Sequence, residues 1–133
     1  MNVFQFSKAT NTGLQYQTEC SNNRHTLVAD ELELNGGMDT GFTPTELLCS
    51  ALAACTTITV RMYTNHKQWP VQAMETLVSY VPGVEENPGF FKRSITLTGN
   101  LNAEQHERII AVASKCPLHK ILSVGHKIQT TIK

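Results

Sequence analysis

One cysteine of this chain, Cys55, lies inside a long run of apolar residues. A cysteine in such surroundings is either a small buried hydrophobe or a reactive thiol. The helix dipole cannot help to activate it, because Cys55 stands in the interior of the predicted helix and that effect fades within the first turn. A reactive Cys55 therefore needs a cation from elsewhere in the fold, and the candidates are Arg24, His25 and Arg61.

A second cysteine, Cys116, precedes Pro117, a residue that favours the first position of a helix. Cys116 would then be the N-cap, where free backbone N–H groups and the helix dipole favour a thiolate. The alternative is a side chain that only fills the break between two helices. His119, three residues further, could reach back toward the thiol or could lie on the surface. A single Cys–His pair of this spacing is weak evidence for a metal site, so we expect no metal.

Three other residues have weaker grounds for a chemical role. Cys49 and Cys55 are six residues apart on one predicted helix, so their directions differ by about 120° and they do not share a face. Cys20 precedes a predicted turn and belongs to no motif, so Cys20 and Cys49 are expected to be packing or incidental thiols. Glu46 is either a helix cap or an active-site carboxylate. Its position nine residues before Cys55 puts it on the opposite face, which favours the cap.

The first half of the chain predicts strands followed by one long helix. Loose alternation and turn residues predict a three-stranded antiparallel meander with strands at residues 3–6, 14–18 and 25–29. Thr43 as N-cap, Pro44 at the first helical position and Glu46 as the capping-box glutamate then begin a helix. That helix runs to about Asn65 and is apolar on nearly every face, which predicts a helix buried on all sides, either at the centre of a sheet or between two subunits.

The second half predicts a hairpin and two shorter helices. Strands are expected at 72–81 and 90–99, followed by a helix with Asn102 as N-cap and Gln105 at the capping-box position. Pro117 breaks that helix and starts another at 117–123, which Gly125 closes, and a last strand follows at 126–132. The order is therefore β-β-β-α-β-β-α-β, an α+β fold.

Length and composition favour one globular domain over residues 1–133. Of 133 residues, 41% are hydrophobic and 17% charged, and the formal net charge is zero, so neither nucleic acid nor an anionic membrane is an expected partner. The N-terminus lacks the features of a secretion signal, and the apolar stretch 47–60 is too short to span a bilayer. We therefore expect a soluble, cytoplasmic protein. A helix too apolar to face water, in a chain too short to cover it, predicts a homodimer.

Several motifs together resemble the OsmC/Ohr family, which comprises osmotically inducible protein C and the organic hydroperoxide resistance proteins. In order along nearly the whole chain, they occupy residues 25–30, 36–37, 41–48, 51–56 and 115–120. A Pro-x-Glu-Leu-Leu helix start, a cysteine after several alanines and a later Cys-Pro are together fairly specific. The residue directly after Pro44 is Thr45, and the glutamate follows one step later, as in the OsmC-like branch of the family.

This resemblance implies an intertwined α+β homodimer with two central helices back to back and two active sites at the subunit interface. It also implies the reduction of organic hydroperoxides, in which Cys55 attacks the peroxide and Cys116 resolves the sulfenic acid as an intrachain disulfide. No metal, flavin or other cofactor takes part, and a dithiol such as a lipoylated protein restores the thiols. The family's activating arginine comes from the early strands, where this chain offers Arg24, with His25 beside it.

Local electrostatics would make Cys116 the more acidic thiol, whereas the resemblance makes Cys55 the attacker. We follow the resemblance, because a buried attacker beside a cation suits an apolar substrate. An organic hydroperoxide should be preferred over hydrogen peroxide, since the residues expected around the thiol are Leu48, Ala51, Leu52, Ile58 and Met62. Two alternatives remain: a non-catalytic redox-sensing or small-molecule-binding protein, and a Cys–His hydrolase, for which no histidine stands out as the partner.

Overall fold

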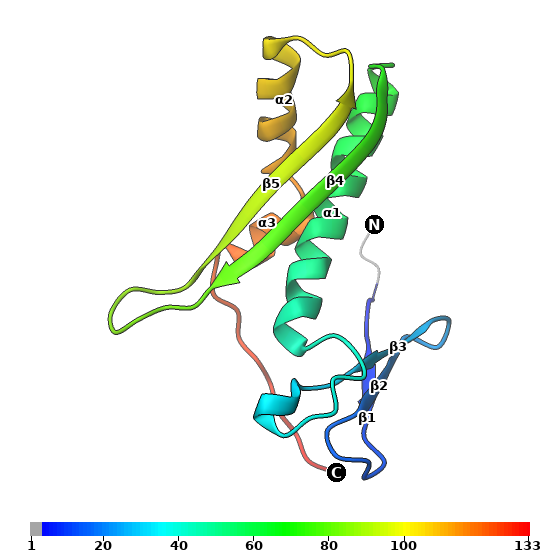
Figure 1. Cartoon of the computed structure of the whole chain (residues 1–133), viewed down its shortest axis with the longest axis vertical. Coiled ribbons are helices and arrows are strands. Elements are labelled where there is room, and N and C mark those ends of the chain that lie inside the picture. The colour runs from blue at the N-terminus through cyan, green and yellow to red at the C-terminus, as the bar shows by residue number, and fades with distance from the viewer. Residues whose placement is uncertain (1–3) are drawn as a thin grey trace. The chain divides into compact units, whose positions relative to one another are not determined.

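The computed structural model describes residues 4–133. The chain divides between Leu48 and Cys49 into two compact units. The N-terminal unit contains three strands and a short 3₁₀ helix: β1 (Lys8–Thr10), β2 (Thr18–Ser21), β3 (Thr26–Ala29) and η1 (Glu33–Asn35). The long helix α1 (Pro44–His66) begins there and continues into the C-terminal unit, which adds β4 (Val71–Val81), β5 (Phe90–Gly99), α2 (Ala103–Ala113) and α3 (Pro117–Leu122) (Figure 1). The expectation of a single domain over 1–133 stays a prediction.

An antiparallel sheet in the order β1-β2-β3 forms the predicted N-terminal meander. The third strand lies where the sequence predicts it, but β1 and β2 begin later than the expected 3–6 and 14–18, and residue 3 lies outside the described residues. A loop replaces the predicted second strand because the Asn11 side-chain amide donates to the carbonyl oxygens of Gln15 and Gln17, at 2.9 Å each. Those bonds, with Gln15 at a φ of 49°, use backbone groups that a strand would need.

The long helix α1 begins with the predicted capping box. The backbone N–H of Thr43 donates to Glu46 Oε1 (2.9 Å), and the backbone N–H of Glu46 donates to Thr43 Oγ1 (3.2 Å). These bonds satisfy donors that a helix N-terminus otherwise leaves free. The helix ends at His66, one residue beyond the predicted end.

Within one chain, α1 is not buried on all sides, so burial within a single chain is excluded and burial between two subunits stays a prediction. Its buried residues recur at every fourth position and are Leu52, Thr56, Val60 and Thr64. Large apolar side chains elsewhere on the helix stay exposed: 42% for Leu48, 54% for Ile58 and 68% for Met62. Within the C-terminal unit the partners of α1 are α2 and one hairpin, which together cover one stripe of it. By length and composition alone α1 could also cross a membrane, a test that core helices of soluble proteins pass as well.

The strands β4 and β5 form a long antiparallel hairpin that carries the core of the C-terminal unit (Figure 1). The half-buried residues of β5 alternate along the strand and are Phe91, Arg93, Ile95 and Leu97. Ile95 and Leu97 pack against the core cluster that α1 and α2 contribute, whose members are Val60, Ile109, Val112 and Ala113. Burial on one face of the hairpin thus fixes which β5 side chains point toward the helices.

Two helices follow the hairpin as the sequence predicts. α2 begins with a complete capping box, in which the Gln105 N–H donates to Asn102 Oδ1 (2.8 Å) and the Asn102 N–H donates to Gln105 Oε1 (2.9 Å). α3 has Cys116 as its N-cap and Pro117 at its first position. It ends at Leu122 rather than at residue 123, where Ser123 is the C-cap.

The predicted strand at 126–132 is absent, so the observed order is β-β-β-α-β-β-α-α. The segment has irregular structure, and its apolar side chains are open to water, with Ile128 at 89% and Ile132 at 99% exposed. A strand needs a neighbour to pair its backbone N–H and C=O groups, and no strand of the described chain pairs with this segment. Apolar alternation alone was therefore insufficient to form a strand here.

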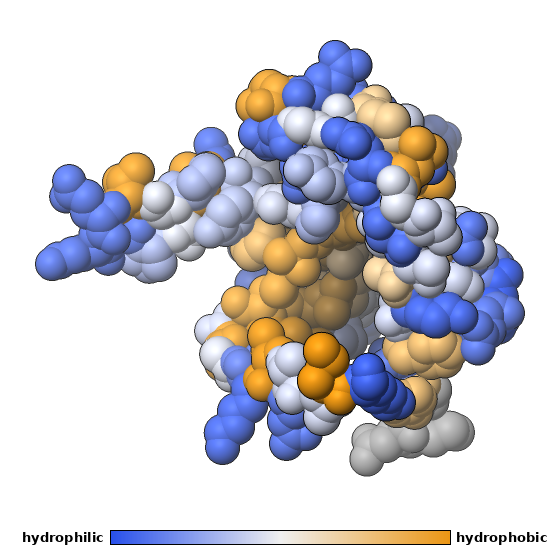
Figure 2. Space-filling view, turned by 90° about the horizontal axis from the view of Figure 1, so that it is seen from below, coloured by the Kyte–Doolittle hydropathy of each residue, from blue (hydrophilic) through white to orange (hydrophobic). Residues whose placement is uncertain are grey.

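Large apolar side chains are exposed on both units of the single chain (Figure 2). The far end of the β4–β5 hairpin, by contrast, presents a mostly hydrophilic surface, as the projecting arm in Figure 2 shows. Soluble proteins that act as monomers rarely expose so much apolar area, so these side chains mark surfaces that bind other molecules or other copies.

Candidate functional site: a thiol pair held by the first turn of α3

The structure brings Cys55 and Cys116 together. Cys55 projects from the middle of α1, Cys116 caps α3, and the two side chains lie near enough for each thiol to shift the pKa of the other. Both are free thiols rather than a disulfide. The pair lies entirely within the C-terminal unit, so its geometry does not depend on where the N-terminal unit lies.

The first turn of α3 gives each sulfur one backbone donor. The N–H of His119 donates to Cys116 Sγ at 3.3 Å, and the N–H of Leu118 donates to Cys55 Sγ. Pro117 has no N–H, so the free donors of this turn begin with Leu118. Such N–H groups favour the charged form of a thiol over its neutral form.

Arg93 supplies a cation beside the pair. Its Nη1 donates to Thr56 Oγ1 (3.0 Å) and to the carbonyl oxygen of Ala113 (3.4 Å), and its Nη2 contacts His119 Nδ1 (3.1 Å). None of these three partners is a carboxylate, so none of them cancels the charge of the guanidinium. That charge remains available to stabilise a thiolate.

Thr56 links the guanidinium to the sulfur. Its hydroxyl is fully buried and lies 3.9 Å from Cys116 Sγ and 2.8 Å from the carbonyl oxygen of Leu52. A hydroxyl has one proton and here has two possible acceptors. When Cys116 is ionised, the Thr56 hydroxyl can donate to the sulfur while Arg93 donates to the hydroxyl oxygen.

The two thiols differ in acidity. Burial raises the pKa of the Cys55 thiol, and the neighbouring Cys116 thiol raises it further, despite hydrogen bonds from Leu118 N–H and Thr59 that lower it. Burial also acts to raise the pKa of Cys116, but four groups outweigh it and leave that pKa below its ordinary value: the His119 N–H, the Cys55 thiol, the Thr56 hydroxyl and the Arg93 charge. Of the two thiols, Cys116 is therefore the one that ionises more readily.

The two thiols also differ in their exposure to solvent, and the less acidic thiol, Cys55, is the more exposed one. Cys116 is 0% exposed, whereas Cys55 is only partly buried. A reagent from solution reaches Cys55 first, while Cys116 can react with Cys55 without leaving the interior.

Arg93 and His119 also line a cavity of about 330 Å³. Most of its other lining is apolar and comes from all three elements around the thiols: Leu52 from α1, Phe90 and Phe91 from β5, and Leu122 from α3. A ligand in this cavity would meet one charged edge and an apolar, partly aromatic wall.

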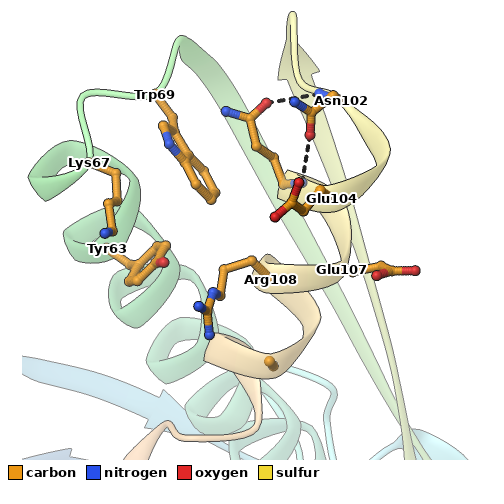
Figure 3. A pocket seen from close by; sticks show the side chains of 9 residues that line it. Tyr63, Lys67, Trp69, Asn102, Glu104, Glu107 and Arg108 are labelled. Carbon is orange, nitrogen blue, oxygen red and sulfur yellow. Dashed lines mark hydrogen bonds between the residues drawn. The ribbon is translucent and has the colours of Figure 1, made fainter.

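A larger cavity, of about 590 Å³, lies between the end of α1 and α2 (Figure 3). Neither cysteine lines it, and its charged groups have both signs: Lys67 and Arg108 against Glu104 and Glu107. Figure 3 shows Arg108 directed toward Tyr63 and Glu107 directed away. Neither cysteine lines the smaller cavity either, but Arg93 and His119 line it and both contact the surroundings of Cys116. The smaller cavity is therefore the one connected with the thiol pair.

The other predicted site residues lie elsewhere. Arg24 and His25 belong to the turn between β2 and β3 in the N-terminal unit, and Glu46 forms the capping box of α1, where the Thr43 N–H and hydroxyl lower its pKa. Cys20 lies in β2 and Cys49 in α1, each half-buried and reduced. Arg61, the third candidate cation, donates to the carbonyl oxygens of Val71 and Gln72 and thereby ties α1 to β4.

The sequence analysis missed Arg93, although the sequence contains a signal for it. Phe91, Ile95 and Leu97 alternate along β5, and Arg93 occupies the same face. A charged residue on the apolar face of a strand must have buried partners, which makes it a candidate for a functional role. Among residues 4–133, no group of three or more His, Cys, Asp or Glu side chains is placed to hold a metal ion.

Comparison with solved structures shows the fold. A protein from Psychrobacter arcticus, described as an osmotic stress induced and detoxification response protein, aligns with a TM-score of 0.78 at 20% identity over 94% of this chain and 91% of its own. An OsmC-like protein from Mycoplasma pneumoniae gives 0.67 at 23% identity, covering 92% and 89%. An organic hydroperoxide resistance protein from Legionella pneumophila gives 0.63 at 21%, covering 90% and 89%.

A comparison with curated protein sequences finds no match. The family model for OsmC-like proteins, however, matches residues 37–133. That span contains α1, the hairpin, both cysteines of the pair and Arg93. Since it is well over half of the sequence, the chain belongs to the OsmC-like protein family.

Proposed function

We propose that this protein is a thiol-dependent peroxidase that reduces organic hydroperoxides through a sulfenic acid at Cys55 and an intrachain disulfide with Cys116. The observation that carries the proposal is the pair of neighbouring, unequal thiols beside the charge of Arg93: Cys55 is partly exposed, whereas Cys116 is buried and has the lower pKa. The family includes hydroperoxide-reducing peroxidases, and proteins named for organic hydroperoxide resistance share the fold.

The reaction begins with a proton shift. Cys55 passes its proton to the Cys116 thiolate and becomes the thiolate itself, held by the Leu118 N–H and by Thr59. Cys55 Sγ attacks the terminal peroxide oxygen, so that an S–O bond forms and the O–O bond breaks. The departing alkoxide takes the proton from Cys116 and leaves as the alcohol.

The second step closes the disulfide. The Cys116 thiolate, restored by that proton transfer, attacks Cys55 Sγ, so the S–S bond forms and the S–O bond breaks. Hydroxide leaves and takes a proton from solvent to become water. The two thiols have supplied the two electrons that the peroxide gained, and a dithiol of the lipoyl type returns them by thiol–disulfide exchange.

The cavity beside Arg93 supports an organic substrate over hydrogen peroxide. Each CH₂ of an alkyl tail buried against Leu52, Phe91 or Leu122 contributes about 0.8 kcal/mol. Three such groups give roughly 50-fold discrimination, because about 1.4 kcal/mol corresponds to tenfold. Hydrogen peroxide has no tail to bury there.

We also propose that two copies of this chain work together. The exposed apolar side chains of α1, among them Ile58 and Met62, suit the face of another helix of the same kind, so the working unit is proposed to be a homodimer in the cytoplasm. Arg24 and His25 remain candidates for a cation that the early strands bring to the thiol.

The decisive experiment follows peroxide consumption with a dithiol present. Wild type should turn over cumene hydroperoxide many times, Cys55→Ser should lose turnover, and Cys116→Ser should stop after one oxidation. Cys49→Ser on the same helix is the matched control and should behave as wild type. A single oxidation by wild type, without turnover, would instead favour a redox sensor.

Two further measurements define the chemistry. Peptide mapping after peroxide exposure should find Cys55 joined to Cys116, and a link from Cys55 to Cys20 or Cys49 would contradict the proposal. The kcat/KM for cumene hydroperoxide should exceed that for hydrogen peroxide, and equal values would remove the case for an apolar substrate site.

A further inference from the structure

The contact between Arg93 and His119 fixes the state of the imidazole. A guanidinium nitrogen can only donate, so the bond from Arg93 Nη2 requires a lone pair on His119 Nδ1. The ring is therefore neutral, with its proton on Nε2. A doubly protonated ring would place a second donor and a second positive charge against the guanidinium, which breaks the contact.

We propose that His119 is a positioning residue, whose neutral ring holds the Arg93 guanidinium against Thr56 beside the thiol pair. The inference rests on the proposed function only for its effect on turnover, because the contact and its effect on the thiols exist without a peroxide. A ring that carried protons on both nitrogens would have no lone pair for Arg93 Nη2, so only the neutral ring can hold the guanidinium in this position.

The geometry of the guanidinium explains why this contact matters. Arg93 Nη1 is shared between Thr56 Oγ1 and the Ala113 carbonyl oxygen, whereas Nη2 has His119 as its recorded side-chain partner. Two contacts at one nitrogen still allow the planar group to turn about that nitrogen. The third contact, at the other nitrogen, fixes the plane of the group.

His119 acts on the site in two independent ways. Its backbone N–H donates to Cys116 Sγ, and this bond survives any change of side chain. Its ring acts only through Arg93. A side-chain variant therefore separates positioning from the helix start of α3, which remains intact.

Several charged or titratable groups surround the ring. Arg93 reaches it from β5, Cys55 lies on α1, and Cys116 precedes it at the cap of α3. From α2, the recorded contact at Arg93 is the carbonyl oxygen of Ala113, which does not titrate. The positive charge of Arg93 and the bond that it donates to Nδ1 both suit a neutral ring.

The test measures Cys116 directly in a Cys55→Ser background, in which it titrates alone. The thiolate is followed by its ultraviolet absorbance and by the rate of alkylation with iodoacetamide across pH. His119→Asn keeps an acceptor near the Nδ1 position but cannot be protonated, and His119→Leu removes the acceptor. His106→Asn, at an exposed position of α2, is the matched control.

The variants should differ in the alkylation rate of Cys116. His119→Leu should lower the alkylation rate of Cys116 near neutral pH by about tenfold, the size expected when a neighbouring charge moves away. His119→Asn, which keeps an acceptor for Arg93, should keep the alkylation rate of the background, and His106→Asn should match the background as well. Equal profiles for His119→Leu and His119→Asn would overturn the proposal.

A spectroscopic measurement decides the case even if His119→Leu folds poorly. In the otherwise unaltered protein, ring nitrogen chemical shifts should show His119 with Nδ1 unprotonated and Nε2 protonated, and Arg93→Lys should abolish that preference. A protonated Nδ1 at neutral pH would overturn the proposal. Neither measurement needs a peroxide, so failure of the peroxidase assay and failure of this inference are distinguishable.

Discussion

Replacing Arg93 with methionine removes the positive charge beside Thr56 while keeping an unbranched side chain that fills similar space. Arg93 Nη1 lies 3.0 Å from Thr56 Oγ1, which lies 3.9 Å from Cys116 Sγ, so nitrogen and sulfur are within about 7 Å of each other. At about 7 Å and an effective dielectric constant of about 20, unit charges attract by about 2 kcal/mol. Losing that attraction raises the pKa of the Cys116 thiol.

The expected effect is a large loss of thiolate at neutral pH. About 2 kcal/mol corresponds to a roughly 30-fold fall in the ratio of thiolate to thiol. The difference from wild type should vanish in alkali, where both proteins are fully ionised, and should be greatest at and below neutral pH. The assay is the alkylation rate of Cys116 against pH, again in the Cys55→Ser background.

Two controls separate charge from general damage. Arg108→Met removes a positive charge from α2 at the larger cavity and should leave the Cys116 profile unchanged. Arg93→Lys keeps the positive charge but loses the planar guanidinium, so its alkylation rate at Cys116 should lie between that of the background and that of Arg93→Met. If Arg93→Met titrates as wild type does, the charge does not act on the thiol and the electrostatic reasoning is refuted.

Three further outcomes are expected. Val60 is 0% exposed in the core, so Val60→Ala should lower the free energy of unfolding in urea by about 1–3 kcal/mol. Ile110 is 66% exposed, so Ile110→Ala should change that free energy by less than about 1 kcal/mol. Similar losses for the two variants would contradict this packing. Asn102→Ala removes the α2 cap and should cost about 1 kcal/mol in thermal unfolding, and no change would show that the capping box is not formed. Sedimentation at micromolar concentration should find a dimer that Met62→Glu dissociates, and a wild-type monomer would refute the proposed homodimer.

Local signals predicted the helices and the hairpin because each signal acts within a few residues. The Thr43–Glu46 and Asn102–Gln105 capping boxes and the Cys116–Pro117 helix start are all formed. The meeting of Cys55 with Cys116 was expected from the family resemblance, since 60 residues separate them and no local rule joins them. The predicted elements are correct where a helix cap, or the alternation within one hairpin, decides the structure.

The errors occurred where a distant partner decides the outcome. Residues 14–17 alternate like a strand, but the Asn11 side chain takes their carbonyl oxygens. Residues 126–132 alternate as well, but pair with no described strand. Arg93 was missed because only the packing of β5 against the helices shows that its side chain reaches Thr56 and His119.

The two backbone N–H groups at the start of α3 affect how easily a Cys55–Cys116 disulfide is reduced back to two thiols. In the reduced site, the His119 N–H donates to Cys116 Sγ, where it would stabilise a thiolate, and the Leu118 N–H acts on Cys55. A neutral disulfide is a much weaker acceptor, so oxidation gives up the stronger of these bonds, about 1.5–3 kcal/mol. That loss makes the disulfide more oxidising by roughly 30–60 mV. If peroxide oxidises the pair as proposed, it is still a strong enough oxidant to close the disulfide. The first turn of α3 would then make the return to two thiols more favourable for a dithiol, because it stabilises the reduced pair and not the disulfide.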